Sequence, residues 1–309
     1  MARKSRGNSR RANDEPVETM DEIIEKYRTA GRIHSQVSKE AKEFVKSGVS
    51  ITEIADLVEG RTRELGGLPA FPCNLSLNDG AAHYTALPDS DYILDKDIIK
   101  VDLGVHIDGY IADGAFTVDL SGEYGDLVKA SEDALAAALD TVKAGVSTSV
   151  IGGVIEDTIH AADFNPVVNL TGHGVAKYEA HSDPTIPNKR IGKGVELNAG
   201  DFIAIEPFVT DGEGFVVDEP RKDIYRLVNP KSTRVPAVRK VLDQIKEYGT
   251  LPFAKRWIQS DKLEYALMQL EKSNIIMGYH ALREVSGGMV SQSEHTLIVT
   301  EDGCEIITL

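Results

Sequence analysis

The stretch KVDLGVHIDGYIAD, residues 100–113, decides the fold. Two runs of apolar residues flank Asp108-Gly109, a dipeptide typical of the two-residue turn of a β-hairpin. A turn centred there pairs Asp102 with Ala115, so Asp113 becomes a diagonal neighbour of Asp102 on the same face. Two carboxylates that close repel each other unless they share a proton, face solvent, or hold a cation between them.

Three further segments place polar side chains in apolar strands. TGHGV (171–175) offers His173, AIEPF (204–208) offers Glu206, and SQSEHTLIV (291–299) offers Glu294. Four carboxylates and one imidazole suit two hard or borderline divalent cations, because four negative charges then balance four positive ones. Ligands spread along the chain are a weak signal, so a shared-proton pair remains open at this point.

The rest of the chain mixes helical and strand patterns. Apolar periodicity predicts helices over 18–47, 124–143 and 149–162, and the capping-box pattern Ser50-x-x-Glu53 opens another that closes near Gly66-Gly67. We expect further hairpins over 201–217 and around Asp302-Gly303. Residues 97–109 and 201–212 resemble each other, which indicates either a duplicated half-domain or an accident.

Composition bounds the class of protein. The 309 residues are 41% hydrophobic, and no apolar run is long enough to cross a membrane. The two cysteines, Cys73 and Cys304, argue against a disulfide framework or a thiolate metal site and fit the cytoplasm. Net charge is −15, although residues 1–11 carry five basic side chains and no acid. We expect a disordered tail there, with contact to the ribosome or another polyanion as the alternative.

A combination of motifs carries a family resemblance. They are FPCNLSLND (71–79) followed by HYT (83–85), VDLGVHIDGYIAD (101–113), TGHGV with a second histidine eight residues later, HSDPTIPN (181–188), IEPF with DGEG, LPFAKRW (251–257) and QSEHT (292–296). From about residue 16 to its end the chain resembles the type II methionine aminopeptidases of archaea. Type II members carry an insertion between the fourth and fifth metal ligands, and this sequence has one there.

The resemblance implies a fold and a domain plan. The fold is the α+β "pita-bread" fold, with two pseudo-symmetric α/β halves around a curved antiparallel sheet. The plan has a disordered basic tail at 1–15, a catalytic domain at 16–220 and 279–309, and a helical, winged-helix-like insertion at 221–278. The insertion has charges of mixed sign, so we expect a lid at the substrate mouth and not a DNA-binding element.

The resemblance also implies the chemistry. The activity is removal of N-terminal methionine from nascent proteins whose second residue is small, by attack of a hydroxide bridging two divalent ions (Co, Mn, Fe or Zn). Asp102 binds one ion, Asp113 and Glu294 bridge both, and His173 and Glu206 bind the other. Glu206 also shuttles the proton. His83 and His181 contact the substrate at the scissile bond, and Phe71, Phe208 and Tyr279 line the methionine pocket.

Other residues receive no catalytic role. We expect His106 to be structural, His295 to point away from Glu294, and Cys73 to be a packing residue; His34, His160 and His280 receive no role. The protein is expected to be a monomer without membrane contact. Two rival interpretations remain: an aminopeptidase P or prolidase of the same fold, and a non-catalytic member that binds the ribosome or a nucleic acid.

Overall fold

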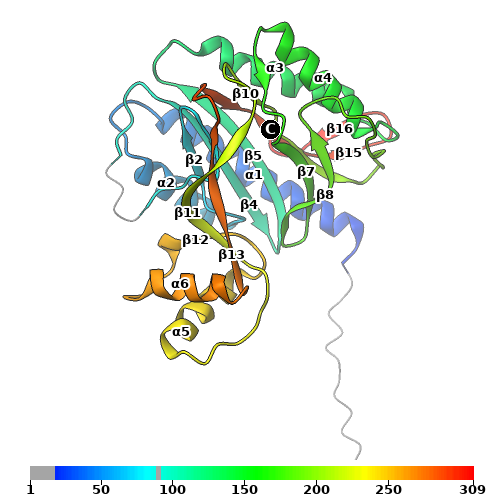
Figure 1. Ribbon diagram of the computed structural model, residues 1–309. Helices are drawn as coiled ribbons and strands as arrows, with labels where there is room; N and C mark the ends of the chain where they lie inside the picture. Colours follow the sequence, from blue (N-terminus) through cyan, green and yellow to red (C-terminus); the bar gives the residue numbers. More distant parts are fainter. Residues whose placement is uncertain (1–17, 88–91) are drawn as a thin grey trace, which may run out of the picture.

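The computed structural model describes residues 18–87 and 92–309, so the basic tail expected at residues 1–15 lies outside the described residues. The described chain is an α+β structure (Figure 1). Its helices are α1 (Met20–Phe44), α2 (Ile51–Glu64), α3 (Gly125–Thr141), α4 (Thr148–Ala161), α5 (Pro236–Ile245) and α6 (Leu263–Lys272), with the short 3-10 turns η1 (Lys246–Tyr248) and η2 (Lys255–Trp257). No helix in these two ranges is both long and apolar enough to cross a membrane.

The strands of the described residues form three sheets. A large antiparallel sheet has the order β1-β4-β5-β15-β9-β7-β8, with β2 on β4 and β16 on β15. Its strands are β1 (Leu68–Pro69), β2 (Asn74–Leu77), β4 (Ile98–Ile107), β5 (Tyr110–Asp119), β7 (Thr171–Ala176), β8 (Glu179–Pro187), β9 (Phe202–Ile205), β15 (Glu294–Val299) and β16 (Cys304–Ile306). The smaller sheets are β14-β10-β6, with β6 (Asn165–Pro166), β10 (Phe208–Thr210) and β14 (Val290–Gln292), and β12-β11-β13-β3, with β3 (Gly80–Ala82), β11 (Val216–Leu227), β12 (Phe253–Ala254) and β13 (Ile276–Glu284).

The hairpin predicted around Asp108-Gly109 is confirmed. Both turn residues have positive φ, 50° and 90°, as a two-residue hairpin turn of this kind requires. The predicted register is also present, because Asp102 pairs with Ala115. A side chain at Gly109 would place its Cβ 2.4 Å from the ring of Tyr178, so the turn needs glycine for space as well as for its backbone angle.

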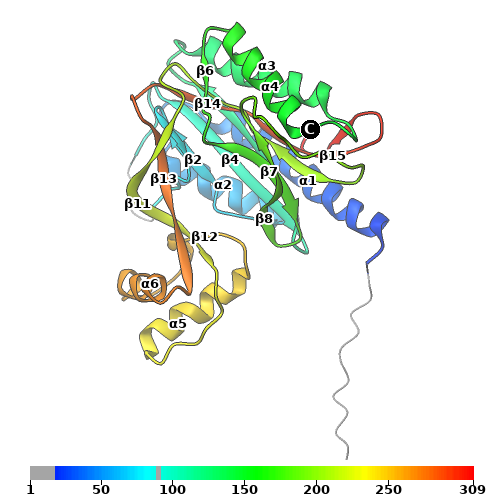
Figure 2. The ribbon, with the colours of Figure 1, turned by 45° about the vertical axis from the view of Figure 1, so that its right-hand side comes forward.

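Two pairs of helices cover the large sheet (Figures 1 and 2). Helix α1 packs on β4 and β5, and α2 packs on α1, β1 and β2, around a cluster that includes Tyr27, Val37 and Val101. Helices α3 and α4 pack together around a second cluster that includes Ile151 and Ile203. The capping box predicted at the start of α2 is present in both directions. Each half of the large sheet is therefore covered by its own pair of helices, with its own apolar cluster beneath them.

The hairpin expected over 201–217 is wrong. Strand β9 joins the large sheet, whereas β10 joins the three-stranded sheet with β14 and β6. The chain changes sheet at Glu206-Pro207, where the proline lacks the N–H that a continuing ladder would need. A second change occurs between β14 and β15, at Ser293, whose N–H donates to the carbonyl of Pro207 at 3.3 Å. The two crossings are therefore joined directly.

The helices α5 and α6 form a separate lobe below the sheet (Figures 1 and 2). They pack around an apolar cluster that includes Val241, Phe253 and Leu267. The antiparallel strands β11 and β13 lead into this lobe and out of it. The expected insertion boundaries, 221 and 278, fall inside these two strands, so the backbone is continuous in β-structure across both positions.

Candidate metal centre

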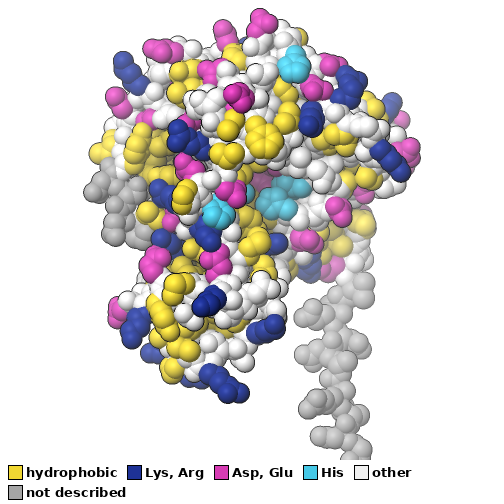
Figure 3. All heavy atoms as spheres, viewed as in Figure 1, with side chains coloured by type: hydrophobic (Ala, Val, Ile, Leu, Met, Phe, Trp, Pro, Cys, Tyr) yellow, Lys and Arg dark blue, Asp and Glu magenta, His cyan; other side chains and the backbone are white. Residues whose placement is uncertain are grey.

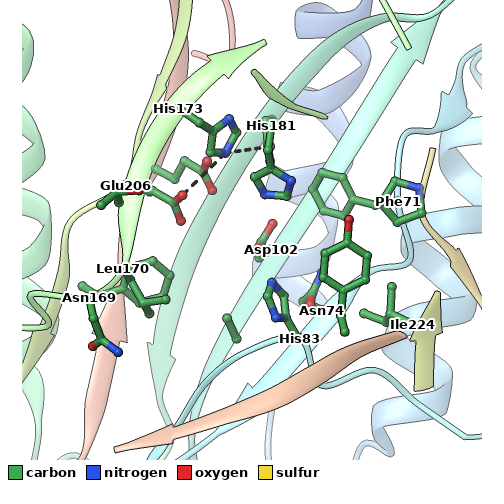
Figure 4. Close-up of a pocket in the computed structure, with 17 residues that line it drawn as sticks. Phe71, Asn74, His83, Asp102, Asn169, Leu170, His173, His181, Glu206 and Ile224 are labelled. Carbon is green, nitrogen blue, oxygen red and sulfur yellow. Dashed lines mark ion pairs between the residues drawn. The ribbon is translucent and has the colours of Figure 1, made fainter. Parts of the chain in front are cut away.

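All ten residues predicted for the site line one cavity of about 210 Å³. They are Phe71, His83, Asp102, Asp113, His173, His181, Glu206, Phe208, Tyr279 and Glu294. In Figure 4 His173 and Glu206 lie on one side of this cavity, Asp102 near its centre, and His83 and Phe71 across from them. Figure 3 shows histidine side chains near the middle of the same face, above the lobe of α5 and α6.

Strand register brings the acids together. Asp102 on β4 pairs with Ala115 on β5, and Ala115 pairs with Glu294 on β15, so the two carboxylates share one row across three strands. The small alanine between them leaves room for both side chains. Asp113 lies two residues from Ala115 and therefore on the same face. On the other side of β15, His173 pairs with Ala204, two residues before Glu206.

The ligand atoms lie within a few ångströms of each other. Nε2 of His173 is 3.5 Å from Oε1 of Glu206 and 3.8 Å from Oδ2 of Asp113. Asp113, His173 and Glu294 each offer one atom to a group whose members lie within 4.8 Å of one another. This spacing suits a common cation, which holds oxygen and nitrogen ligands at about 2.0–2.6 Å.

The four carboxyl groups are in an environment that disfavours their charge. Burial raises the pKa of Asp102 to about 7, and burial followed by mutual repulsion raises the pKa of Asp113, Glu206 and Glu294 well above the ordinary value. Oδ1 of Asp102 and Oδ1 of Asp113 are buried without a hydrogen-bond partner within the described part of the chain. A cation is the partner that satisfies such oxygens, so the residues present fit a divalent metal.

His173 has the protonation state that metal binding needs. Burial lowers its pKa to about 4, so the ring is neutral near pH 7. Nδ1 lies 3.1 Å from the carbonyl oxygen of Gly174, which assigns the N–H to Nδ1. The lone pair therefore sits on Nε2, which faces Glu206 and Asp113. This second-sphere hydrogen bond fixes the tautomer, as is usual for histidine ligands.

The two other cavity histidines are neutral as well. Burial, with contributions from His173 and His83, lowers the pKa of His181 to about 3, and its ring centroid lies 4.4 Å from that of His173. Burial also lowers the pKa of His83. Nδ1 of His83 lies 3.2 Å from the carbonyl of His280, and its ring packs against the edge of Tyr279. Both imidazoles therefore offer hydrogen bonds without a full charge.

Sequence reasoning missed Gln292. Its side-chain Nε2 lies 3.4 Å from Glu206, 3.5 Å from Asp102 and 3.5 Å from Glu294. The backbone of Gln292 is held at both its N–H and its C=O by the hydroxyl of Thr117. The signal was its position two residues before Glu294 in QSEHT, but an amide in a strand does not stand out as a buried acid does.

The residues expected to be structural lie outside the cavity. Nδ1 of His106 accepts from the N–H of Gly109 at 3.1 Å and so supports the turn, while His295 contacts the Thr308 hydroxyl at 2.8 Å. His34 contacts the carbonyl of Gly114 at 3.3 Å. Cys73 is buried, and burial raises the pKa of its thiol well above the ordinary value, which disfavours the nucleophilic thiolate.

Comparison with known proteins places the chain in a family. The family model described as metallopeptidase family M24 matches residues 25–301. The chain is 47% identical to a methionine aminopeptidase from Archaeoglobus fulgidus, over 93% of this chain and 99% of that protein. It is 45% identical to one from Methanothermobacter thermautotrophicus, over 94% and 100%. A crystal structure of a methionine aminopeptidase from Thermotoga maritima superposes with a TM-score of 0.70 at 25% identity, covering 94% of this chain and 98% of that one.

These matches show that the chain belongs to metallopeptidase family M24 and, within that family, to the methionine aminopeptidases of the archaeal type. The predicted pita-bread fold is confirmed. Family membership implies the use of divalent metal.

Proposed function

We propose that this member of family M24 removes the N-terminal methionine of nascent polypeptides in the cytoplasm, with two divalent cations held by Asp102, Asp113, His173, Glu206 and Glu294. The observation that carries the proposal is the convergence of four acids and a neutral imidazole in one cavity, with buried carboxylate oxygens that no described residue satisfies. Oxygen and nitrogen ligands of this kind suit cobalt, manganese, iron or zinc.

The number of cations follows from charge. With all four carboxyl groups ionised the buried site would carry four negative charges, which two divalent ions would neutralise and one would not. Asp102 would hold one ion, His173 and Glu206 would hold the other, and Asp113 and Glu294 lie where they would contribute to holding both. When bound, the two cations lower the pKa of a water molecule toward neutrality and so supply hydroxide for attack on the methionyl carbonyl.

Side chains of the protein transfer the proton and form hydrogen bonds with the scissile peptide. Glu206, whose carboxylate lies in the cavity beside His173, takes the proton from the attacking water and delivers it to the leaving amine. His181 donates a hydrogen bond to the developing oxyanion. His83, with its Nδ1–H engaged by the His280 carbonyl, keeps Nε2 free to accept the N–H of the scissile peptide.

An apolar wall of the cavity selects methionine. Phe71, Phe208 and Tyr279 line it together with Leu170 and Ile224. A flexible thioether side chain fills an irregular apolar space of this kind and favours aromatic contacts. We propose that the substrate's second residue must be small, so that the tetrahedral intermediate fits in the cavity. Residues 221–278 act as a lid, because Ile224 and Pro252 line the cavity from that segment.

The test is mass spectrometry of Met-Ala-Ser incubated with metal-free protein and with each candidate metal added back. We expect release of methionine only after metal is added, and no release from an Xaa-Pro dipeptide. Asp113→Asn should bind metal poorly and cleave nothing. Asp157→Asn, which removes an acid from an exposed ion pair with Arg190, is the matched control and should behave as the unchanged protein.

Three results would count against the proposal. Preferential cleavage of the Xaa-Pro dipeptide would favour an aminopeptidase P or prolidase. Near-normal turnover by Asp113→Asn would contradict the proposed role of Asp113 as a metal ligand. Less than one divalent ion per chain, with no peptide cleaved, would favour a non-catalytic binding protein. If the active enzyme holds only one divalent ion per chain, the proposed number of cations is wrong, but the proposed activity stands.

A further inference from the structure

A second cavity adjoins the catalytic one. It measures about 380 Å³ and shares His181, Pro252 and Tyr279 with the metal-site cavity. Its other lining residues come from the turn between β7 and β8, from the end of β11 and from the lobe; they are Lys177, Tyr178, Glu179, Ala180, Arg226, Leu227, Val228 and Thr250. A polypeptide bound with its methionine at the metal site must leave that site along some path, and this cavity provides one.

Strand β11 connects the two cavities. Ile224 pairs with Tyr279 and Arg226 pairs with Met277 in unbroken register, so Ile224 and Arg226 stand on the same face of the strand. Two residues along a strand correspond to about 7 Å. Ile224 lines the metal-site cavity, and Arg226 lines the second one. An extended peptide lying along β11 would therefore meet Arg226 about two residues beyond the residue beside Ile224.

Arg226 is a cation for which the described part of the chain provides no ion-pair partner. Its Nε is buried with no hydrogen bond, and no ion pair joins it to another residue in the ranges 18–87 and 92–309. The other cation of the cavity, Lys177, is already paired with Glu18 at 2.7 Å. Glu179 lines the same cavity but is exposed and makes no ion pair with Arg226 in the described structure. Burial raises the pKa of the Tyr279 hydroxyl, and the positive charge of Arg226 opposes that rise, which is consistent with Arg226 facing the junction.

We propose that the second cavity binds the substrate beyond the scissile bond, and that Arg226 pairs with a carboxylate on its third or fourth residue. This inference rests on the proposed function and names a subsite for it. A guanidinium presents a planar fork that matches a carboxylate with two hydrogen bonds. The chain as a whole is strongly acidic, at −15, and by itself would repel an acidic substrate. A preference for acid at these positions therefore requires a local cation.

The experiment compares peptide amides that differ only in carrying a glutamate carboxylate or a glutamine carboxamide at one position. Met-Ala-Glu-Ser-amide and Met-Ala-Ser-Glu-amide are assayed against their glutamine counterparts, and Met-Ala-Ser with a free C-terminus against its amide. The last pair distinguishes a terminal carboxylate from a side-chain one. We expect glutamate to raise kcat/KM about tenfold over glutamine at one of the two positions, mainly through KM, as a charge-assisted hydrogen bond in a half-exposed site provides.

Variants and the salt dependence test whether Arg226 causes the preference for glutamate over glutamine. Arg226→Gln should abolish the glutamate preference, Arg226→Lys should keep part of it, and Arg190→Gln, which removes a cation from an exposed position outside both cavities, should keep all of it. Raising the salt concentration should shrink the preference in the unchanged protein. Equal rates for glutamate and glutamine at both positions, or an unchanged preference in Arg226→Gln, would overturn the inference. Failure to cleave any methionyl peptide would instead overturn the proposed function.

Discussion

Metal binding to this protein should release protons from carboxyl groups and not from histidine. In the metal-free protein burial raises the pKa of Asp102 to about 7, and burial followed by mutual repulsion raises the pKa of Asp113, Glu206 and Glu294 well above the ordinary value. Near pH 6.5 the carboxyl of Asp102 therefore holds a proton that a bound cation must displace. His173, whose pKa is lowered to about 4, has already lost its proton at that pH.

The sign and the size of the effect follow from linkage. A carboxyl with a raised folded-state pKa binds a proton that the unfolded chain has lost above about pH 4. The stability of the metal-free protein contributed by Asp102 is therefore full below about pH 4 and is lost as the pH rises toward 7. Each displaced proton makes metal binding about 1.4 kcal/mol, or tenfold, more favourable per pH unit. For Asp102 the window of about three pH units corresponds to roughly 4 kcal/mol.

The measurement is titration calorimetry of the metal-free protein between pH 6 and 7, in buffers with different ionisation enthalpies. Heat that varies with the buffer counts the released protons, and we expect at least one per chain. His106→Gln, on the same strand as Asp102 but outside the cavity, is the control and should give the same proton count. A heat independent of the buffer, with an affinity independent of pH, would refute this account of the site.

Three substitutions test other parts of the structure. Gly104→Ala places a Cβ 2.3 Å from the ring of Phe71, so we expect the ring to move into the methionine pocket and KM for methionyl peptides to rise about tenfold, with metal affinity unchanged. Glu59→Ala leaves Arg256 buried without its counter-ion and should lower the free energy of unfolding in urea by about 3–5 kcal/mol. Gln292→Ala removes the amide beside three carboxylates and should weaken metal binding, measured by calorimetry, about tenfold or more.

The sequence predicted the features that depend on neighbours along the chain. Asp108-Gly109 needs only its two positive φ angles to set the register of β4 and β5, and that register alone placed Asp102 and Asp113 on one face. The capping box of α2 is similarly local, because its hydrogen bonds join residues three apart. Local chemistry of this kind can be read before the rest of the fold is known.

The sequence could not predict which sheet each strand joins. Residues 201–217 hold Asp211-Gly212 between two apolar runs, so they resemble a hairpin. In the structure β9 pairs with β15 and β7, whereas β10 pairs with β14 and β6, all of them distant in the chain. The similarity between residues 97–109 and 201–212 also fails to predict how each strand continues. Asp102 and Glu206 do reach the same cavity, but β4 continues past its acid, whereas β9 ends before Glu206.

The crossings between sheets explain why a charged cavity exists at all. A strand inside a continuous sheet packs each face against neighbours and leaves no space for several carboxylates. Glu206 follows the point where β9 leaves the large sheet, and Glu294 opens β15 where the chain re-enters it. The hydrogen bond from the Ser293 N–H to the Pro207 carbonyl joins the two crossings, so the sheets part at one place and the cavity opens there. The acids of β4 and β5 face this opening from the intact hairpin. Periodicity shows which face of a strand is apolar, but the parting of two sheets is a property of strand pairing, and only the structure reveals it.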